Sequence, residues 1–375
     1  MISSRALGIH GGVNPDLTES LNAATNVYAI DPISDHRWSV LAAEHPKSGI
    51  FHSGAWLEAL RLSYGYQPIA YTTSPPGEPL RNALLFCRVD SWLTGRRLVS
   101  LPFTDHCDPL LHDPADLQVI LSAIEKEVAQ EGWRYIEIRP RVACRVITSL
   151  SQTHYNYDFH EIDLAPSIGN LFDNLHGNSV QRKIARAERE NVTYHAGRSE
   201  TLLRDFYKLF LLTRKRHRVP PHPFRWFRNL VDGMDKALTV HVAFKNGRAI
   251  AAILTLNYKQ TVTYKYGCSD VRFSNLGGTQ FLFWKCIQEA KASGMSTFDL
   301  GRSDCGNAGL IAFKNRLGST RFPLSYSRFA TSPRAMSHLT ENHNNVAVGL
   351  ARRMIASIPN SILSAMSNVF YKHVG

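Results

Sequence analysis

The chain has 375 residues, of which 44% are hydrophobic and 20% charged, so it can form one large globular domain or two of ordinary size. Its formal net charge of +12 favours anionic partners such as nucleic acid, phosphorylated substrates or an acidic membrane surface. It has no run of 18 apolar residues and no signal-peptide core, which argues against a membrane-spanning protein and leads us to expect a cytoplasmic location. The six cysteines lack metal-ligand spacing, so no metal site is expected.

The first half of the chain has the pattern of an α/β domain. Residues 1–30 are rich in Gly, Ser and Asn without periodicity, and we expect a flexible tail there. Ser53 is placed to cap a short helix, and a helical repeat of apolar residues predicts a second helix over 114–132. Strand-like runs separated by Pro and Gly cover residues 68–73, 82–89, 96–103 and 135–139.

The second half repeats this order of elements. A helix is predicted to begin with Asn178 as its N-cap, and another over 202–217 carries an apolar face. A meander of strands follows, and the pair Asn246–Gly247 predicts a type I′ hairpin at its first turn. The meander strands, a helix and a last strand are expected at residues 238–244, 249–258, 261–267, 279–294 and 296–300.

Two short segments of the chain echo one another. Residues 131–139 and 293–302 both run from a helix end through a glycine into a strand that carries an acid and then an arginine. Glu137 and Asp299 occupy matching places in the two segments. This echo predicts a duplicated unit and therefore two similar α/β domains.

Most of the positive charge is concentrated in one segment. Residues 178–228 contain thirteen Lys or Arg against four Asp or Glu, an excess of nine. Arg182, Arg186 and Arg189 share one face of the predicted helix. The segment is either a solvated face or a surface for a polyanion, since Lys and Arg make most contacts with phosphates.

The C-terminal residues 334–375 differ from the rest of the chain. They are apolar, contain scattered Arg and Lys, and are interrupted by Pro359. We expect amphipathic helices there. These helices either pack on the body of the protein or lie on an acidic membrane surface as a peripheral contact.

Five segments carry a resemblance to a known family: NSVQRKIARAERE, FYKLFLLTRKRHRVPPHP, YKYGCSD, FDLGRSDCGNAGLIAFKNRLGS and LSYS. Their order resembles that of the FemAB-like branch of the GNAT acyltransferases, in which a basic helix opens the second domain and a Phe-Lys pair follows an acid–x–Gly–Arg strand end. The resemblance is strong over about 165–330 and weaker over 50–163. The coiled-coil arm of some relatives and the R/Q-x-x-G-x-G/A loop of acetyl-CoA-using members have no counterpart here.

This resemblance implies a fold and a function. The implied fold is α/β with two tandem GNAT-like domains, mixed sheets flanked by helices, over residues 31–163 and 164–333. The implied function is N-acyl transfer of an acyl or aminoacyl group to an amine of a cell-envelope or exopolysaccharide precursor, and the resemblance allows a precursor linked to a lipid or a nucleotide. The donor would be acyl-CoA or aminoacyl-tRNA, used as a co-substrate without a bound cofactor. The alternatives are an acyl-CoA-dependent acetyltransferase of a small molecule and a non-catalytic RNA-binding relative.

Acyl transfer to an amine requires a proton acceptor, a group that stabilises the developing oxyanion, and alignment of the reactants. The resemblance implies that Lys314, in the Phe-Lys pair, lies at the reacting centre. Asp299 and Arg302 either form a pocket wall or an internal ion pair. Asp105 is a general base, an orienter of the acceptor or a turn residue, and His106 is an alternative base.

Further candidate residues lie on the basic helices, the aromatic strands and a glycine pair. The glycines, Gly277 and Gly278, precede a helix and would offer backbone N–H groups to a phosphate of the co-substrate. The alternative role of the tyrosines is in the core, and the alternative role of the histidine is structural. The candidate substrate-binding residues, besides Arg302, are Lys183, Arg186, Arg214, His217, Tyr264, Tyr266 and Tyr326.

Overall fold

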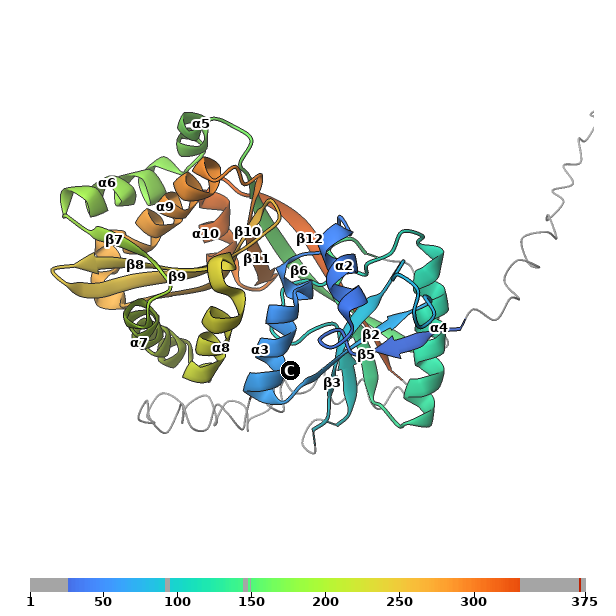
Figure 1. Ribbon diagram of the computed structural model, residues 1–375. Helices are drawn as coiled ribbons and strands as arrows, with labels where there is room; N and C mark the ends of the chain where they lie inside the picture. The colour runs from blue at the N-terminus through green and yellow to red at the C-terminus, as the bar shows by residue number, and fades with distance from the viewer. Residues whose placement is uncertain (1–25, 92–94, 144–147, 149, 331–370, 372–375) are drawn as a thin grey trace, which may run out of the picture.

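A computed structural model describes residues 26–91, 95–143, 148, 150–330 and 371. The strands in these ranges form one twelve-stranded sheet in the order β1-β2-β3-β4-β5-β12-β6-β11-β10-β9-β8-β7. The first half of the chain forms one end of this sheet and the second half the other, with helices packed on its faces (Figure 1). The sheet contains both parallel and antiparallel pairs, which confirms the predicted mixed α/β architecture.

The first half follows the predicted order of helices and strands. Ser53 caps α3, because its side chain accepts a hydrogen bond from the backbone N–H of Trp56 at 3.3 Å. The expected end of the tail at residue 30 is wrong, because Tyr28–Ile30 form a strand that pairs with Ala70–Thr72; residues 1–25 lie outside the described ranges. The elements are β1 (Tyr28–Ile30), α2 (His36–Glu44), α3 (Gly54–Tyr64), β2 (Gln67–Thr72), β3 (Leu84–Val89), β4 (Arg97–Val99), α4 (Ala115–Gln130) and β5 (Tyr135–Ile138).

The second half also follows the prediction, with one corrected cap. Asn178 is not an N-cap: it lies inside a π-helical turn, Gly177–Gln181, which is capped by the side chain of His176. The backbone φ angles of Asn246 (50°) and Gly247 (75°) are both positive, as the predicted type I′ hairpin requires. Apart from its last strand, the elements of this half are α5 (Ile168–Asp173), α6 (Arg182–Arg189), β7 (Thr193–Gly197), α7 (Glu200–His217), α8 (Phe224–Met234), β8 (Leu238–Lys245), β9 (Arg248–Tyr258), β10 (Thr261–Ser269), α9 (Gly278–Ala292), β11 (Thr297–Asp304) and α10 (Ala308–Arg316).

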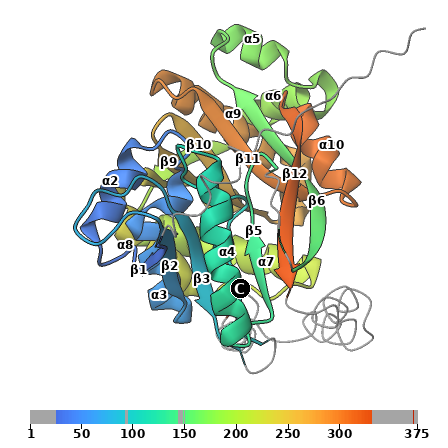
Figure 2. The same cartoon turned by 90° about the vertical axis from the view of Figure 1, so that its right-hand side faces the viewer.

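Two long strands join the halves. β6 (Ser151–Asp163), which the sequence analysis missed, pairs with β11 of the second half and with β12 (Thr320–Ala330). β12 then pairs with β5 of the first half. Figure 2 shows β6 and β12 side by side between the two halves. Each half therefore completes the sheet of the other. The predicted domain boundary at 163/164 stays a prediction.

The echo between Glu137 and Asp299 has a structural basis. β4 pairs with β5 in parallel, and Val99–Glu137 is its last paired position. β10 pairs with β11 in parallel, and Thr263–Asp299 is its last paired position. Both acids therefore sit where a parallel strand pair comes apart, as the predicted duplication requires.

The predicted C-terminal helices over 334–375 lie outside the described residues, apart from Tyr371. The ring of Tyr371 stacks on His222 at a centroid distance of 4.2 Å, so this one position contacts the second half. Among the described helices, none is both long enough and apolar enough to cross a membrane.

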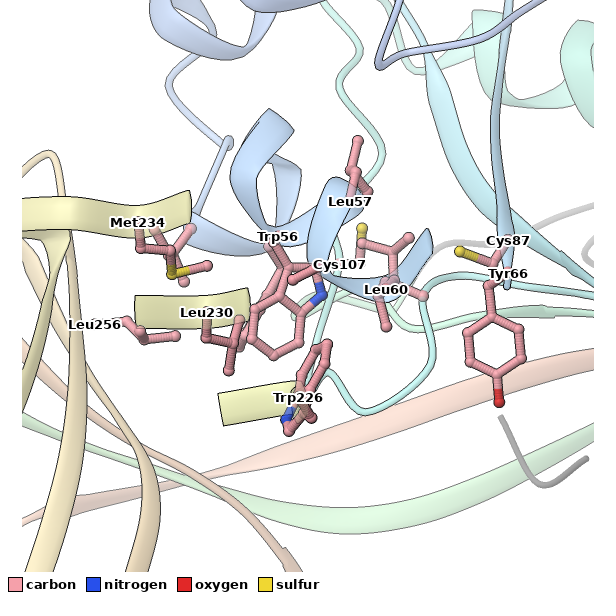
Figure 3. Close-up of a cluster of buried hydrophobic side chains, with 14 of the residues drawn as sticks. Trp56, Leu57, Leu60, Tyr66, Cys87, Cys107, Trp226, Leu230, Met234 and Leu256 are labelled. Atoms are coloured by element: carbon pink, nitrogen blue, oxygen red, sulfur yellow. The ribbon is translucent and has the colours of Figure 1, made fainter. Parts of the chain in front are cut away.

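The largest apolar core lies where α3 of the first half meets α8 of the second (Figure 3). Trp56 and Trp226 are both fully buried and meet edge to face at 5.2 Å. Leu57, Leu60, Leu230 and Met234 extend this contact along the two helices. The halves are therefore joined by packed aromatic side chains as well as by strand pairing.

Replacing Trp56 by Ala should lower the free energy of unfolding by about 3–5 kcal/mol, because the cavity cannot be refilled between two helices. Urea unfolding followed by circular dichroism measures this change. Leu62→Ala on the same helix is the matched control: its side chain is 59% exposed, so its effect should stay within about 0.5 kcal/mol. A loss below about 1 kcal/mol for Trp56→Ala would show that this contact does not hold the halves together.

Candidate active site

The structure brings five of the predicted site residues together between the halves. Asp105 comes from the loop after β4 in the first half. Asp299 and Arg302 come from β11, Lys314 from α10 and Tyr326 from β12. They meet because β12 and β6 carry the chain across the junction, so that β11 faces the loop of Asp105. We call these residues, with Lys265, His106 and Tyr157 described below, the junction cluster.

A bulge in β11 shapes the centre of this cluster. The register between β11 and β6 shifts between Asp299 and Arg302. Gly301 lies in the bulge with a φ of +71°, and its N–H donates to Asp299 Oδ1 at 2.6 Å. A Cβ atom at this position would lie 3.1 Å from Asp105 Oδ2. Glycine is therefore required twice, for the left-handed backbone and for the close approach to Asp105.

Lys314 anchors the backbone of the bulge. Its side chain is buried, and Nζ donates to the backbone carbonyls of Gly301 at 2.8 Å and Arg302 at 2.9 Å. Burial lowers the pKa of Lys314 to about 8, although the carboxylates of Asp105 and Asp299 act in the opposite direction. The ammonium group thus fixes the backbone of the bulge and adds a positive charge next to it.

Asp105 is paired with a lysine that the sequence analysis did not single out. Lys265 of β10 donates to Asp105 Oδ2 at 2.9 Å, and its side chain is only 6% exposed. Burial acts to raise the pKa of Asp105, but the charges of Lys265 and Arg302 outweigh it and lower that pKa. The available signal was a lysine between two tyrosines on a buried strand, in the segment YKYG.

Arg302 lies against two neighbouring aromatic rings beside Asp105. Its guanidinium lies 4.2 Å from the ring centroid of Tyr157 and 5.3 Å from that of Tyr326. The Tyr326 hydroxyl donates to the backbone carbonyl of Asp105 at 2.5 Å. Tyr326 therefore fixes the loop that carries Asp105, and Tyr157, from the missed strand β6, fixes Arg302.

Asp299 is paired with His106 across the junction. The His106 Nε2 atom lies 2.9 Å from Asp299 Oδ2, and both side chains are buried. Asp299 therefore makes an internal contact across the junction, one of the two roles left open by the sequence. Its part in a pocket wall stays a prediction. Within the described ranges, no group of three or more His, Cys, Asp or Glu side chains is arranged to hold a metal ion.

Lys183, Gly277 and Gly278 lie at a second place, a small pocket of about 90 Å³ at the start of α9. The two glycines have a packing role there. A Cβ at Gly277, where φ is +75°, would lie 2.4 Å from the Lys183 carbonyl, and one at Gly278 would lie 3.1 Å from the Ile250 side chain. Asp270 also lines this pocket. Phosphate binding at these residues stays a prediction.

The remaining candidates lie outside the junction cluster. Arg186 of α6 lies 4.0 Å from Glu190 on the same helix. Arg214 and His217 are in the last turn of α7, where Arg214 lies over the ring of Phe210 and burial lowers the pKa of His217. The two helices pack on opposite faces of the sheet, so Arg186 does not share a surface with Arg214 and His217.

Tyr264 and Tyr266 have core contacts. Tyr264 packs against Phe283 at 4.9 Å, and the Tyr266 hydroxyl accepts a hydrogen bond from Trp226 Nε1 at 2.9 Å. Both rings hold β10 in place. They position Lys265, which lies between them in the chain.

Comparisons with known proteins identify the domain family of part of the chain. Residues 176–315 match the profile of the acetyltransferase (GNAT) domain family. The chain is 26% identical over 149 residues to a UDP-N-acetylmuramoylpentapeptide-lysine N(6)-alanyltransferase of Weissella viridescens, a match that covers 38% of this chain and 43% of that protein. The chain thus spans less than half the length of this curated relative.

Solved structures show the same fold. A crystal structure of FemX superposes with a TM-score of 0.63 at 13% identity, covering 84% of this chain and all of that one. A tandem GNAT protein from the clavulanic acid biosynthesis pathway superposes with a TM-score of 0.50 at 8% identity, covering 82% of this chain and 99% of that one.

Fold and profile match together define a tandem GNAT-fold protein, as the sequence predicted. Within that fold class the chain is similar to FemAB-like proteins, which confirms the resemblance found in the five sequence segments.

Gly301→Ala should destabilise the protein by about 1–3 kcal/mol, because alanine strains the positive φ and crowds Asp105. Gly306→Ala, in the turn just after β11, is the matched control, since nothing lies within 4 Å of its Cβ position and no positive φ applies. Thermal unfolding of both variants measures the difference. Equal melting temperatures for the two would contradict the tight approach of the bulge to Asp105.

Proposed function

We propose that this protein is an N-acyltransferase that transfers an acyl or aminoacyl group to an amine of a cell-envelope or exopolysaccharide precursor. The observation that supports this most is the junction cluster: four of its charged residues (Lys265, Asp299, Arg302 and Lys314) lie inside the segment that matches the GNAT profile. The similarity to an enzyme named as an alanyltransferase of a lysine amine supports an amine acceptor.

The donor is an activated acyl group. The GNAT fold implies acyl-CoA as the co-substrate. Aminoacyl-tRNA is the alternative donor, because the positive charge of the basic segment 178–228 suits a nucleic acid. Both donors carry phosphates, so both suit the positive charge of the second half.

The chemistry assigned to the cluster follows from its charges. The amine nitrogen attacks the donor carbonyl carbon, a C–N bond forms, and the C–S bond of a thioester or the C–O bond of an ester then breaks. The negative charge on the carbonyl oxygen is stabilised by the cations around the bulge, Lys265, Arg302 and Lys314. Asp105, ionised because its pKa is lowered, orients the acceptor amine. His106, held by Asp299, takes the proton that the amine loses and passes it to the leaving sulfur or oxygen, which departs as a thiol or hydroxyl.

Lys314→Ala should lower kcat/KM for transfer by at least about 100-fold, because it removes both the buried charge and the anchor of the bulge. Arg316→Ala is the control, since Arg316 is exposed on the same helix. Steady-state kinetics measure both, and circular dichroism shows whether the Ala variant keeps its fold. A folded Lys314→Ala variant with the rate of the Arg316 control would remove Lys314 from the mechanism.

The pH dependence gives an independent check on the charge of Lys314. Its pKa is lowered to about 8, so the ammonium form is present below that pH and is lost above it. Transfer should therefore fall as the pH rises through about 8. In Lys314→Arg, whose side chain stays charged, the falling limb of the rate profile should move to higher pH; a limb unchanged near 8 would assign it to another group.

The function itself is tested by offering donors and acceptors directly. Purified protein is incubated with acetyl-CoA, a long-chain acyl-CoA or alanyl-tRNA, together with a UDP-N-acetylmuramoyl pentapeptide, and mass spectrometry follows the acceptor. Thermal unfolding with each donor alone reports binding, since a ligand at about 100 times its Kd adds roughly 2.7 kcal/mol. An acceptor heavier by one acyl group supports the proposal. Donor binding without transfer to this or any other envelope amine contradicts it.

A further inference from the structure

A groove of about 530 Å³ runs over the strands that join the two halves, next to the junction cluster. Its walls are mostly apolar: Phe159 and Leu324 form the buried part, and the exposed ring of Phe322 stands at its side. Residues 141–143 line another side of it. An apolar groove with few polar groups beside a charged site is the usual form of a small-molecule site.

One carboxylate lines this groove without a partner. Glu161 of β6 is half-buried, and no hydrogen bond or ion pair to it is found among the described residues. The arginine that shares the groove, Arg141, is engaged elsewhere: its backbone N–H and its Nε both bond the carboxylate of Asp108, at 2.7 and 3.2 Å. A half-buried carboxylate without a hydrogen-bond partner is costly, so this position is suited to a cationic ligand. Burial indeed raises the pKa of Glu161, with Arg141 opposing and Asp299 adding to the effect.

Glu161 is also directly connected to the candidate catalytic residues. It lies opposite Asp299 in the pairing of β6 with β11. Asp299 holds His106, whose ring meets Phe159 of the groove edge to face at 5.5 Å. A cation bound at Glu161 would therefore lie on the same side of the strand pair as Asp299, which holds the imidazole that we assign as proton acceptor.

From this arrangement we infer that the groove binds the acceptor as a primary alkylammonium group, with the ammonium at Glu161 and its aliphatic chain against Phe159, Leu324 and Phe322. The inference rests on the proposed function in naming this ligand the acceptor. The binding site itself is independent of transfer. An acceptor that binds in this way must be an amine carried on an aliphatic chain.

The site is tested with hexylammonium as the probe, and with hexanol and hexanoate as neutral and anionic chains of equal length, by ligand-observed NMR titration at pH 7. Hexylammonium should bind the wild-type protein at least about tenfold more tightly than either analogue, because only it pairs with the carboxylate. Glu161→Gln should weaken its binding at least about tenfold, whereas Glu188→Gln, the same change at an exposed position of α6, should not. Phe322→Ala should reduce the gain in affinity from butylammonium to hexylammonium.

Each contrary result has a distinct meaning. Binding of hexanoate as tight as that of hexylammonium would make the groove a site for an acyl chain and overturn the inference, as would the absence of any binding. The wild-type comparison needs no variant, so it stands even if Glu161→Gln fails to fold. Amine-selective binding in a protein without transfer activity would contradict only the proposed function. Transfer without amine-selective binding would contradict only this site.

Discussion

The approach of Gly301 to Asp105 is the constraint on which the rest of the site depends. A backbone with positive φ and no side chain lets β11 reach the loop of the other half, and Lys314 fixes that backbone through two carbonyl groups. The approach is possible only because β6 and β12 exchange places between the halves and bring β11 to the junction. Strand exchange, bulge and buried lysine are thus parts of one arrangement that concentrates charge in a desolvated place.

The acidic residue of the duplicated unit has a different role in each half. In the first half, Glu137 pairs with Arg139 at 2.7 Å and with Arg328. Although burial acts to raise it, these two arginines hold the pKa of Glu137 at about 2, so the carboxylate is fully satisfied within the core. In the second half, the matching Asp299 bonds a histidine and a backbone N–H. The same position of the fold therefore supplies stability in one half and a candidate site in the other.

Local signals in the sequence predicted local structure well. The Ser53 cap, the Asn246–Gly247 turn and the helical apolar repeats each act over a few residues, and the structure confirms them. β6 was missed although Tyr155, Tyr157 and Phe159 alternate along it, because its partners β11 and β12 lie more than a hundred residues away. Lys314 was named from a resemblance, and Asp105 and Arg302 from their residue types. Lys265 and Tyr157 gain their roles only from pairings that no short pattern encodes.

The central claim is that the ion pair between Asp105 of one half and Lys265 of the other holds both side chains in the positions that acyl transfer needs. The most direct test is a double-mutant cycle on kcat/KM with Asp105→Asn, Lys265→Met and the double variant. Each single change should lower kcat/KM at least about 100-fold. The kcat/KM of the double variant should be little lower than that of the less active single variant, because the two side chains depend on each other. Additive losses, or a single variant with the wild-type rate, would contradict the account.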